Sequence, residues 1–360
     1  MLVGPSGGGK SNIFNTLMDT LIEVNATGYK MPRMNPKAVR PQEMYGETDP
    51  QSQEWVKGVF ASIWERANNK ANPYWTWIMM DGPVDAIWIE DLNTVLDDNK
   101  ILTLANGDRF PMTDNCKIMF EVETLKNASP ATVSRAGIIY VSDTDLDWGP
   151  MVEGIIRLRP DTHKDVLRTI IKKYAGDSDP IFPGEFFNFI TRNTKPVMAT
   201  DRVGNMSSLF NLMKGLIDGD GCPVTLSDDP DTLAAQLEKV FLYCLAWSGG
   251  GLLEPEDRIA MDEFIRKVDN THMPPCVEGD TVFEWHLDQN CEWSPWDTPK
   301  WIYPNTEKLD FANLLVPTMD STRALYAIKH LHKNSNAVLM VGSPGTAKTS
   351  TALMFFESLA

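Results

Sequence analysis

The chain has 360 residues, a net charge of −16 and a hydrophobic fraction of 42%. These values are typical of a globular protein with two or three folding units, and the acidic balance disfavours nucleic acid as a partner. No apolar run approaches the length of a membrane span, and the five cysteines form no C-x-x-C pair that would predict a zinc site or a disulfide framework.

The first element in the chain is a phosphate-binding loop, Gly4-Pro5-Ser6-Gly7-Gly8-Gly9-Lys10-Ser11, which matches G-x-x-x-x-G-K-[ST] in full. Such a loop follows a buried strand and opens a helix, and its glycines let backbone N–H groups surround a phosphate. The flanks fit, because apolar residues 1–3 precede the loop and a helix is expected over residues 12–24. Ile13, Leu17, Leu21 and Val24 share one face of that helix. Lys10 would reach the β- and γ-phosphates, and Ser11 would bind Mg²⁺.

Strands and helices alternate from residue 1 to 143, as in a parallel α/β layer. We expect a strand edge at 35–38 and a buried strand over 75–80 that ends at Asp81, with further core strands at 117–120 and 137–141. Helices are expected over 87–96 and on an apolar face formed by Trp55, Val56, Val59, Phe60 and Ile63. Asn106-Gly107 predicts a hairpin turn.

Helical periodicity dominates from residue 144 to 275, with helices expected over 151–158, 164–174, 207–217, 233–247 and 259–268. Residues 276–310 are irregular and rich in aromatic side chains, which favours a crossover that packs one module against the next over a ligand site. Residues 311–360 contain an expected strand at 337–341 and a helix from Lys348 onward.

A second phosphate-binding loop lies between that strand and that helix. It reads Gly342-Ser343-Pro344-Gly345-Thr346-Ala347-Lys348-Thr349, with Ala347 in place of the last glycine. Gly342, Gly345 and Lys348 would bind a second nucleotide, and Thr349 its Mg²⁺. The loops begin 338 positions apart, which predicts one complete repeat of a tandem NTPase array and the start of the next. The short strand before the first loop and the end inside a helix predict a segment of a longer polypeptide.

An α/β nucleotide domain followed by a helical domain is the arrangement of an AAA+ module. The runs NPKA, MYGETD, DGPVDAIWIEDLNTVLDDNK, LANGDRF, KIMFEVETLKNASPATVSRAG and LLVPTMDSTR resemble the second module of the dynein heavy chain ring. VLMVGSPGTAKTS resembles the P-loop of the third module, and LANGDRFPM is most similar to axonemal outer-arm heavy chains. The resemblance covers essentially the whole chain.

This resemblance implies an AAA+ P-loop NTPase fold, a parallel sheet with helices on both faces, followed by a helical small domain. The large α/β domain would occupy residues 1–143 and the helical domain 144–275. The crossover would occupy 276–310 and the start of the next module 311–360. ATP (or ADP) and Mg²⁺ are the implied cofactors.

The end of the strand before Gly82 bears on hydrolysis. An active ATPase of this class ends that strand with Asp-Glu, where Asp supports Mg²⁺ and Glu activates the attacking water. Here Asp81 is followed by Gly82, and the nearest acids are Asp85 and Glu90. We therefore predict a site that holds Mg²⁺–ATP with little hydrolysis. The alternative is that Glu90 acts as a substitute base. The resemblance implies the same, since the second dynein module is regarded as an ATP-holding site.

Arg135 follows the run Ser129–Ser134 and precedes the last core strand. In AAA+ rings an arginine at this place enters the neighbouring nucleotide site, so Arg135 is the candidate arginine finger for the preceding module. A structural arginine paired with a local carboxylate is the alternative.

Sensor residues are less specific. Glu121 and Glu123 occupy the region where a sensor would read the γ-phosphate, although plain solvent-side carboxylates are equally expected. Arg202, at the start of a helix, is the candidate second sensor, with Arg258 as the alternative. Residues 316–318 would lie on the adenine side of the next site.

The resemblance implies neighbouring AAA+ modules as partners, and microtubules with dynein intermediate and light chains through parts absent from this chain. It also implies a place in the cytoplasmic cytoskeleton and in the axoneme of a cilium or flagellum. The net charge and the lack of a long apolar run predict no nucleic-acid and no membrane partner. Two alternatives remain. An active ring ATPase of the midasin type is disfavoured by Gly82, and a structural protein with degenerate loops is disfavoured by the intact Gly9-Lys10-Ser11.

Overall fold

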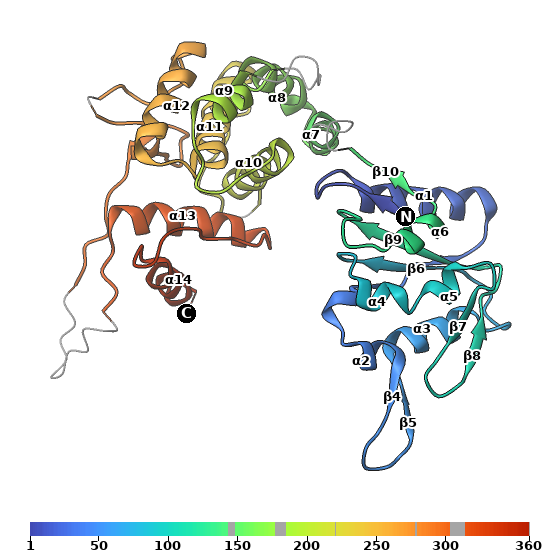
Figure 1. The fold of residues 1–360 in the computed structure, drawn as a ribbon. Coiled ribbons are helices and arrows are strands. Elements are labelled where there is room, and N and C mark those ends of the chain that lie inside the picture. Colours follow the sequence, from blue (N-terminus) through green and yellow to red (C-terminus); the bar gives the residue numbers. More distant parts are fainter. Residues whose placement is uncertain (143–147, 177–184, 220, 278, 303–313, 360) are drawn as a thin grey trace. The chain divides into compact units, whose positions relative to one another are not determined.

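The computed structural model describes residues 1–142, 148–176, 185–219, 221–277, 279–302 and 314–359 (Figure 1). The chain divides into two compact units, Met1–Leu146 and Asp147–Ala360. Each unit has its own buried core. No helix in the described ranges is both long and apolar enough to cross a membrane.

The first unit is built on a six-stranded sheet in which β10-β1-β9-β6-β2 are neighbours and β3 also pairs with β6. Every pairing in this sheet is parallel. The carboxyl ends of its strands therefore lie at one edge, where open α/β sheets bind ligands. The strands are β1 (Leu2–Val3), β2 (Tyr29–Lys30), β3 (Arg33–Met34), β6 (Trp75–Asp81), β9 (Cys116–Val122) and β10 (Ile139–Tyr140).

Helices cover both faces of this sheet (Figure 1). Successive side chains of β6 point to opposite faces. Met80 packs on one face with Trp64 of α3 (Val59–Ala67), whereas Met79 packs on the other with Phe14 of α1 (Lys10–Asn25). Burial on both faces explains why residues 77–80 of β6 are all apolar. The predicted α/β fold class, followed by a helical unit, is confirmed.

Short elements complete the first unit. They are η1 (Pro36–Ala38), α2 (Pro41–Tyr45), the hairpin of β4 (Gly46–Thr48) and β5 (Trp55–Lys57), α4 (Ala86–Glu90), α5 (Asn93–Leu96), the hairpin of β7 (Ile101–Thr103) and β8 (Arg109–Pro111), and α6 (Pro130–Arg135). The predicted turn at Asn106-Gly107 is confirmed, because it joins β7 to β8 and Gly107 has φ 90°.

Three predicted elements of this unit are wrong. Residues 35–38 form a 3₁₀ turn rather than a strand edge, because the Asn35 side chain accepts a hydrogen bond from Lys37 N and Pro36 has no N–H to donate. Trp55 and Val56 belong to strand β5, and helix α3 begins only after Gly58. The helix expected over 87–96 is divided into α4 and α5.

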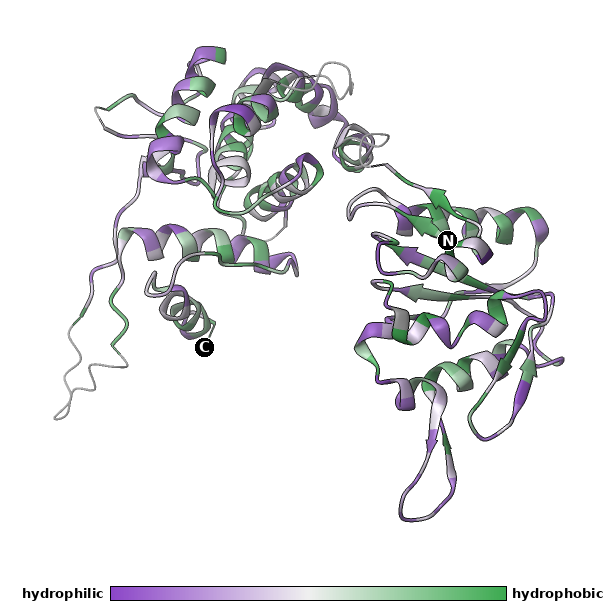
Figure 2. Cartoon of the chain, viewed as in Figure 1, coloured by the Kyte–Doolittle hydropathy of each residue, from purple (hydrophilic) through white to green (hydrophobic). Residues whose placement is uncertain are grey.

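Helix α1 buries a different face from the expected one. Phe14 is buried, whereas Ile13, Leu17 and Val24 are 38%, 47% and 74% exposed. Figure 2 shows hydrophobic and hydrophilic residues alternating along α1. The 3.6-residue period identified the helix, but only packing on the sheet selects the face that is buried.

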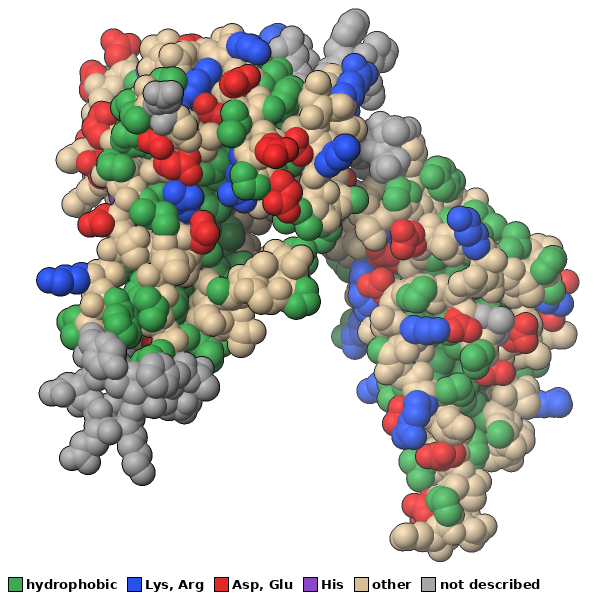
Figure 3. All heavy atoms as spheres, turned by 60° about the vertical axis from the view of Figure 1, so that its left-hand side comes forward, with side chains coloured by type: hydrophobic (Ala, Val, Ile, Leu, Met, Phe, Trp, Pro, Cys, Tyr) green, Lys and Arg blue, Asp and Glu red, His purple; other side chains and the backbone are tan. Residues whose placement is uncertain are grey.

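The second unit contains a bundle centred on α11 (Pro230–Gly250), which contacts α8, α10 and α12. The other helices are α7 (Trp148–Arg157), α8 (Asp161–Tyr174), α9 (Glu185–Asn193), α10 (Arg202–Ile217) and α12 (Pro255–Val268). All five helices expected from the sequence are present, and α9 was missed. On the face drawn in Figure 3, acidic and basic side chains of the described residues are interspersed.

Beyond α12, the second unit continues through η2 (Val282–Glu284) and the hairpin of β11 (Trp285–Leu287) and β12 (Trp293–Pro295) to helices α13 (Met319–Lys333) and α14 (Lys348–Glu357). Indole N–H groups hold the aromatic segment, because Trp296 donates to Phe283 O at 3.0 Å and Trp293 to His272 O at 2.8 Å.

The strand predicted at 337–341 is wrong. These residues have no regular structure and Leu339 is 75% exposed. A strand needs a neighbour to satisfy its backbone groups, and the described part of this unit pairs none with it. The predicted helix from Lys348 is confirmed as α14.

Candidate functional site

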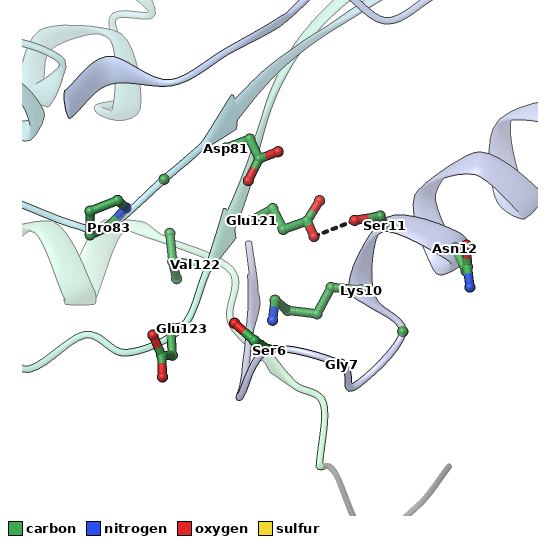
Figure 4. Close-up of a pocket in the computed structure, with 12 residues that line it drawn as sticks. Ser6, Gly7, Lys10, Ser11, Asn12, Asp81, Pro83, Glu121, Val122 and Glu123 are labelled. Atoms are coloured by element: carbon green, nitrogen blue, oxygen red, sulfur yellow. Dashed lines mark hydrogen bonds between the residues drawn. The ribbon is translucent and has the colours of Figure 1, made fainter. Parts of the chain in front are cut away.

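The first phosphate-binding loop joins β1 to α1 at the carboxyl edge of the sheet. Gly7 and Gly9 both have φ 84°, a conformation that suits glycine. Gly4 has no room for a side chain, since a Cβ there would lie 1.9 Å from Val141 O. The loop borders a pocket of about 530 Å³, which is also lined by residues 81–83 and 121–123 (Figure 4).

Lys10 lies within the curve of this loop (Figure 4). Its buried ammonium donates to Gly4 O and Pro5 O, both at 2.7 Å. The cation is thus held at the N-terminus of α1, where backbone N–H groups and the helix dipole also attract an anion. This arrangement fits the β- and γ-phosphates of a nucleotide.

The second loop repeats this geometry within the second unit. Lys348 Nζ donates to Gly342 O at 2.9 Å and Ser343 O at 2.7 Å. Ala347 has φ 57°, the left-handed conformation that Gly9 adopts in the first loop. The left-handed conformation raises the free energy of an alanine by roughly 1–2 kcal/mol. The loop therefore keeps its shape although Ala347 is strained. Gly345 has φ 85°, and Thr349 follows Lys348 in the first turn of α14.

Three adjacent strands present charged side chains beside Ser11. Asp81 and Glu121 are register partners on β6 and β9, so their carboxylates project on the same face of the sheet. Arg33 of β3 donates through one nitrogen to both, at 2.9 Å to Asp81 and 3.2 Å to Glu121. Ser11 Oγ donates to Glu121 Oε1 at 2.5 Å (Figure 4). Among the predicted site residues, Lys10, Ser11, Asp81 and Glu121 therefore come together.

The Asn35 side chain lies against Gly82, the position at which an active ATPase of this class carries its catalytic glutamate. A Cβ on Gly82 would lie 2.5 Å from Asn35 Oδ1 and 3.0 Å from Asn35 Cγ. Asn35 is fixed there because its side chain caps η1. Gly82 therefore has no side chain, and a larger residue there would displace the Asn35 side chain from its cap.

Neither alternative acid lines the pocket formed by the described residues. Asp85 caps α4 by accepting from Ile87 N and pairs with Lys37. The Lys37 hydrogen bond and this cap hold the pKa of Asp85 below its usual range. Glu90 is exposed at the end of α4. Glu123 lines the pocket but points away from Ser11 (Figure 4).

Arg135 ends α6 and pairs with Asp97, while its guanidinium also donates to Ala131 O at 3.4 Å. Its side chain is 33% exposed. The local carboxylate partner considered from the sequence is therefore present. An exposed pair of this kind contributes about 0–1 kcal/mol, which leaves the guanidinium able to take another partner.

The remaining candidates lie in the second unit. Arg202 is the first residue of α10, directly after the Asp201 cap. Arg258 lies over the Phe283 ring at 4.6 Å, so it packs on an aromatic side chain. Thr318 caps α13.

Arg33 and the contact between Asn35 and Gly82 were not predicted from the sequence. A cation at the end of a strand next to the Asp81 strand was the available signal for Arg33. This signal was not recognised because the second strand was expected at 35–38 instead of 33–34.

The described residues contain no group of three or more His, Cys, Asp or Glu side chains able to hold a metal alone. One hydroxyl and two carboxylates do not fill the coordination shell of Mg²⁺ by themselves. These donors therefore fit a Mg²⁺ ion that arrives with a nucleotide, whose phosphate oxygens would complete the shell.

Three family models match successive parts of the chain. Residues 1–136 match the AAA domain of the dynein-related subfamily, and residues 182–298 match the dynein heavy chain AAA lid domain. Residues 303–360 match the P-loop containing dynein motor region.

Full-length relatives match over nearly the whole chain. The dynein gamma chain of the flagellar outer arm from Chlamydomonas reinhardtii is 44% identical over 99% of this chain and 8% of its own length. Dynein axonemal heavy chain 5 of Mus musculus is 38% identical over 97% of this chain and 7% of its own. Dynein axonemal heavy chain 2 of Homo sapiens is 32% identical over 100% of this chain and 8% of its own. The chain thus spans less than a tenth of these relatives.

Proposed function

Because this chain belongs to the dynein heavy chain family, we propose that its first P-loop module holds Mg²⁺–ATP with little hydrolysis inside a dynein motor ring. The module would serve microtubule-based movement in the axoneme of a cilium or flagellum. Neighbouring AAA+ modules of the same polypeptide would be its direct partners. Microtubules and dynein intermediate and light chains would bind elsewhere in the longer protein.

The observation that carries this proposal is the side-chain-free position after Asp81. Hydrolysis needs a base beside the attacking water, and loss of such a base costs about 10²–10⁴ in rate. Gly82 supplies none, and Asn35 occupies the adjoining space. Binding has no such deficit, because the Lys10 loop is complete.

The chain's own residues divide the work of binding. Gly4, Gly7, Gly8 and Gly9 let the loop close around the phosphates, and Lys10 balances their charge. Ser11 and Asp81 would hold the magnesium ion, which neutralises phosphate charge when bound. Arg202 would serve as a second sensor.

The second loop would bind a nucleotide of the next module in the same way. Gly342, Gly345 and Lys348 would contact phosphates, and Thr349 would bind magnesium. We place the helical small domain at residues 144–275, the inter-module crossover at 276–310 and the start of the next module at 311–360.

We assign Arg135 the role of arginine finger for the preceding module. Its 33% exposure and its position at the end of α6 support this role. A guanidinium that reaches a neighbour's γ-phosphoryl group accelerates transfer by on the order of 10³–10⁵.

A single-turnover assay tests the holding role. In a heavy chain that supplies the neighbouring modules and carries Lys→Ala in its other P-loops, the Lys10 site is loaded with γ-labelled ATP, freed of excess nucleotide and sampled for bound ATP, bound ADP and phosphate. We expect intact bound ATP and turnover far below the 1–10³ s⁻¹ typical of enzymes. Hydrolysis within that range that Glu90→Gln abolishes would contradict the proposal and assign Glu90 as the base.

A further inference from the structure

We propose that Glu121 is the positioning residue that orients the Ser11 hydroxyl toward magnesium, and that Arg33 is its counter-ion. This inference rests on the proposed nucleotide-holding function and adds two residues to it. Asp81 alone would be expected to support Mg²⁺ in a P-loop site, whereas here the hydroxyl is held by the neighbouring strand.

The first observation is the direction of the hydrogen bond that the Ser11 hydroxyl makes. A serine hydroxyl that binds a cation uses an oxygen lone pair, so its proton must be donated elsewhere. In the structure that proton goes to Glu121 Oε1 at 2.5 Å, the short length of a bond to a carboxylate. The lone pairs of Ser11 are thereby left for another ligand. Figure 4 shows the Ser11–Glu121 bond at the head of α1, beside the loop.

The Glu121 side chain is more deeply buried than that of Asp81. The Glu121 side chain is 10% exposed, against 43% for Asp81. A carboxylate so far removed from water needs hydrogen-bond partners, and Glu121 has one on each oxygen. It is therefore fixed in place before any ligand arrives, while the Asp81 side chain stays accessible to solvent.

Arg33 offsets the charge of the two carboxylates. Asp81 and Glu121 face each other across adjacent strands, an arrangement that repels when both are ionised. Arg33 contacts both, so the three side chains together carry one net negative charge instead of two. That total equals the charge of a single magnesium-supporting aspartate. Arg33 thus makes the additional carboxylate compatible with a bound polyphosphate.

The same contacts explain why Glu121 does not replace the missing base. Oε1 accepts from Ser11 and Oε2 accepts from Arg33. Both oxygens are thus engaged with side chains of this unit rather than turned to an attacking water. An acid at this position then favours retention of the nucleotide over its hydrolysis.

The test measures the affinity of the chain for a fluorescent ATP analogue with saturating Mg²⁺ and with EDTA. The ratio of the two affinities is the gain due to magnesium. We expect Glu121→Gln to lower this gain about 10–100-fold, the usual effect of losing a group that orients a metal ligand, with little change in EDTA. Glu23→Gln, an exposed glutamate of α1, is the matched control.

Two further variants separate orientation from general damage. If Glu121 acts through the Ser11 hydroxyl, the double variant of Ser11→Ala and Glu121→Gln loses no more gain than Ser11→Ala alone. Arg33→Gln is expected to weaken Mg²⁺-free ATP binding about tenfold, because two carboxylates then face the phosphates unopposed.

The outcomes distinguish this inference from the function on which it rests. A wild-type chain that binds no ATP analogue overturns the holding function itself. A wild-type chain that binds, with a Glu121→Gln variant whose magnesium gain equals that of Glu23→Gln, overturns the role of Glu121 alone. Should Glu121→Gln fail to fold, unchanged Mg²⁺-free affinity in Arg33→Gln overturns the inference instead.

Discussion

The Asn35 side chain occupies the space beside Gly82, so that a Cβ on Gly82 would lie 2.5 Å from Asn35 Oδ1. A side chain at position 82 would therefore have to displace the Asn35 side chain. Asn35 is held in position by its bond from Lys37 N at 2.9 Å. The low rate of hydrolysis proposed above is thus favoured by the position of Asn35 as well as by the glycine at position 82.

We predict that Gly82→Glu destabilises the first unit by about 1–3 kcal/mol through overpacking and leaves ATP turnover near the wild-type rate. Combining it with Asn35→Ala opens the space, and turnover is then expected to rise about 10²-fold. Chemical denaturation and single-turnover hydrolysis measure the two effects. Asn35→Ala alone is the control, with a loss of about 1 kcal/mol for the cap. Rapid hydrolysis by Gly82→Glu alone would show that the site is open.

Lys10 provides the test of which loop binds nucleotide more tightly. ATP at one hundred times its Kd stabilises a binding unit by about 2.7 kcal/mol. We expect Lys10→Ala to remove most of the ATP-dependent rise in Tm and Lys348→Ala to retain it, since no strand forms before the second loop. Thermal denaturation with and without Mg²⁺–ATP measures the difference. A larger loss in Lys348→Ala would identify the second loop as the main site.

Spacing along the chain identifies some residues of the site but not the contacts between them. Lys10, Ser11 and Asp81 were identified because their spacing along the chain encodes their chemistry. Glu121 was placed near the phosphates, but its bond to Ser11 depends on the register of β9 with β6, which no local pattern contains. Arg33 was missed for a different reason, because its strand was expected at 35–38 and forms at 33–34.

Packing also explains the errors in the fold. Apolar side chains at 55 and 56 and at 59, 60 and 63 satisfy a helical period, yet Gly58 separates a strand from a helix. Ile13 and Leu17 satisfy it too, although Phe14 is the residue that the sheet covers. Periodicity therefore located elements, while the choice of buried face required the neighbouring element.

Arg135 and Asp97 give a third prediction, tested in a heavy chain that contains the preceding module. Arg135→Ala should lower ATP hydrolysis by that module on the order of 10³–10⁵-fold while nucleotide binding at Lys10 persists. Asp97→Asn removes only the local pair, so hydrolysis should remain. Steady-state ATPase and ATP-analogue binding measure the two properties. Undiminished ATPase in Arg135→Ala would leave Arg135 a structural partner of Asp97.

His330 in α13 makes the stability of the second unit depend on pH. Burial lowers the pKa of His330 to about 4 from 6.5, assisted by Lys329 and Lys333 and opposed by a hydrogen bond with the Gly215 backbone. Between these two values the unfolded chain binds the proton and the folded chain does not, so stability falls as pH falls. Above pH 6.5 both states are neutral at this residue and the effect vanishes.

From pH 7 to pH 5 we therefore expect the second unit to lose about 1–2 kcal/mol of unfolding free energy through this histidine. His330→Phe keeps an aromatic ring beside Tyr326, whose centroid lies 4.3 Å from that of His330. This variant should show a flatter dependence over the same range, whereas His332→Gln should behave as wild type. Urea denaturation at several pH values measures the slopes. Equal slopes in His330→Phe and wild type would show that other groups carry the pH dependence, since a phenyl ring binds no proton in either the folded or the unfolded state.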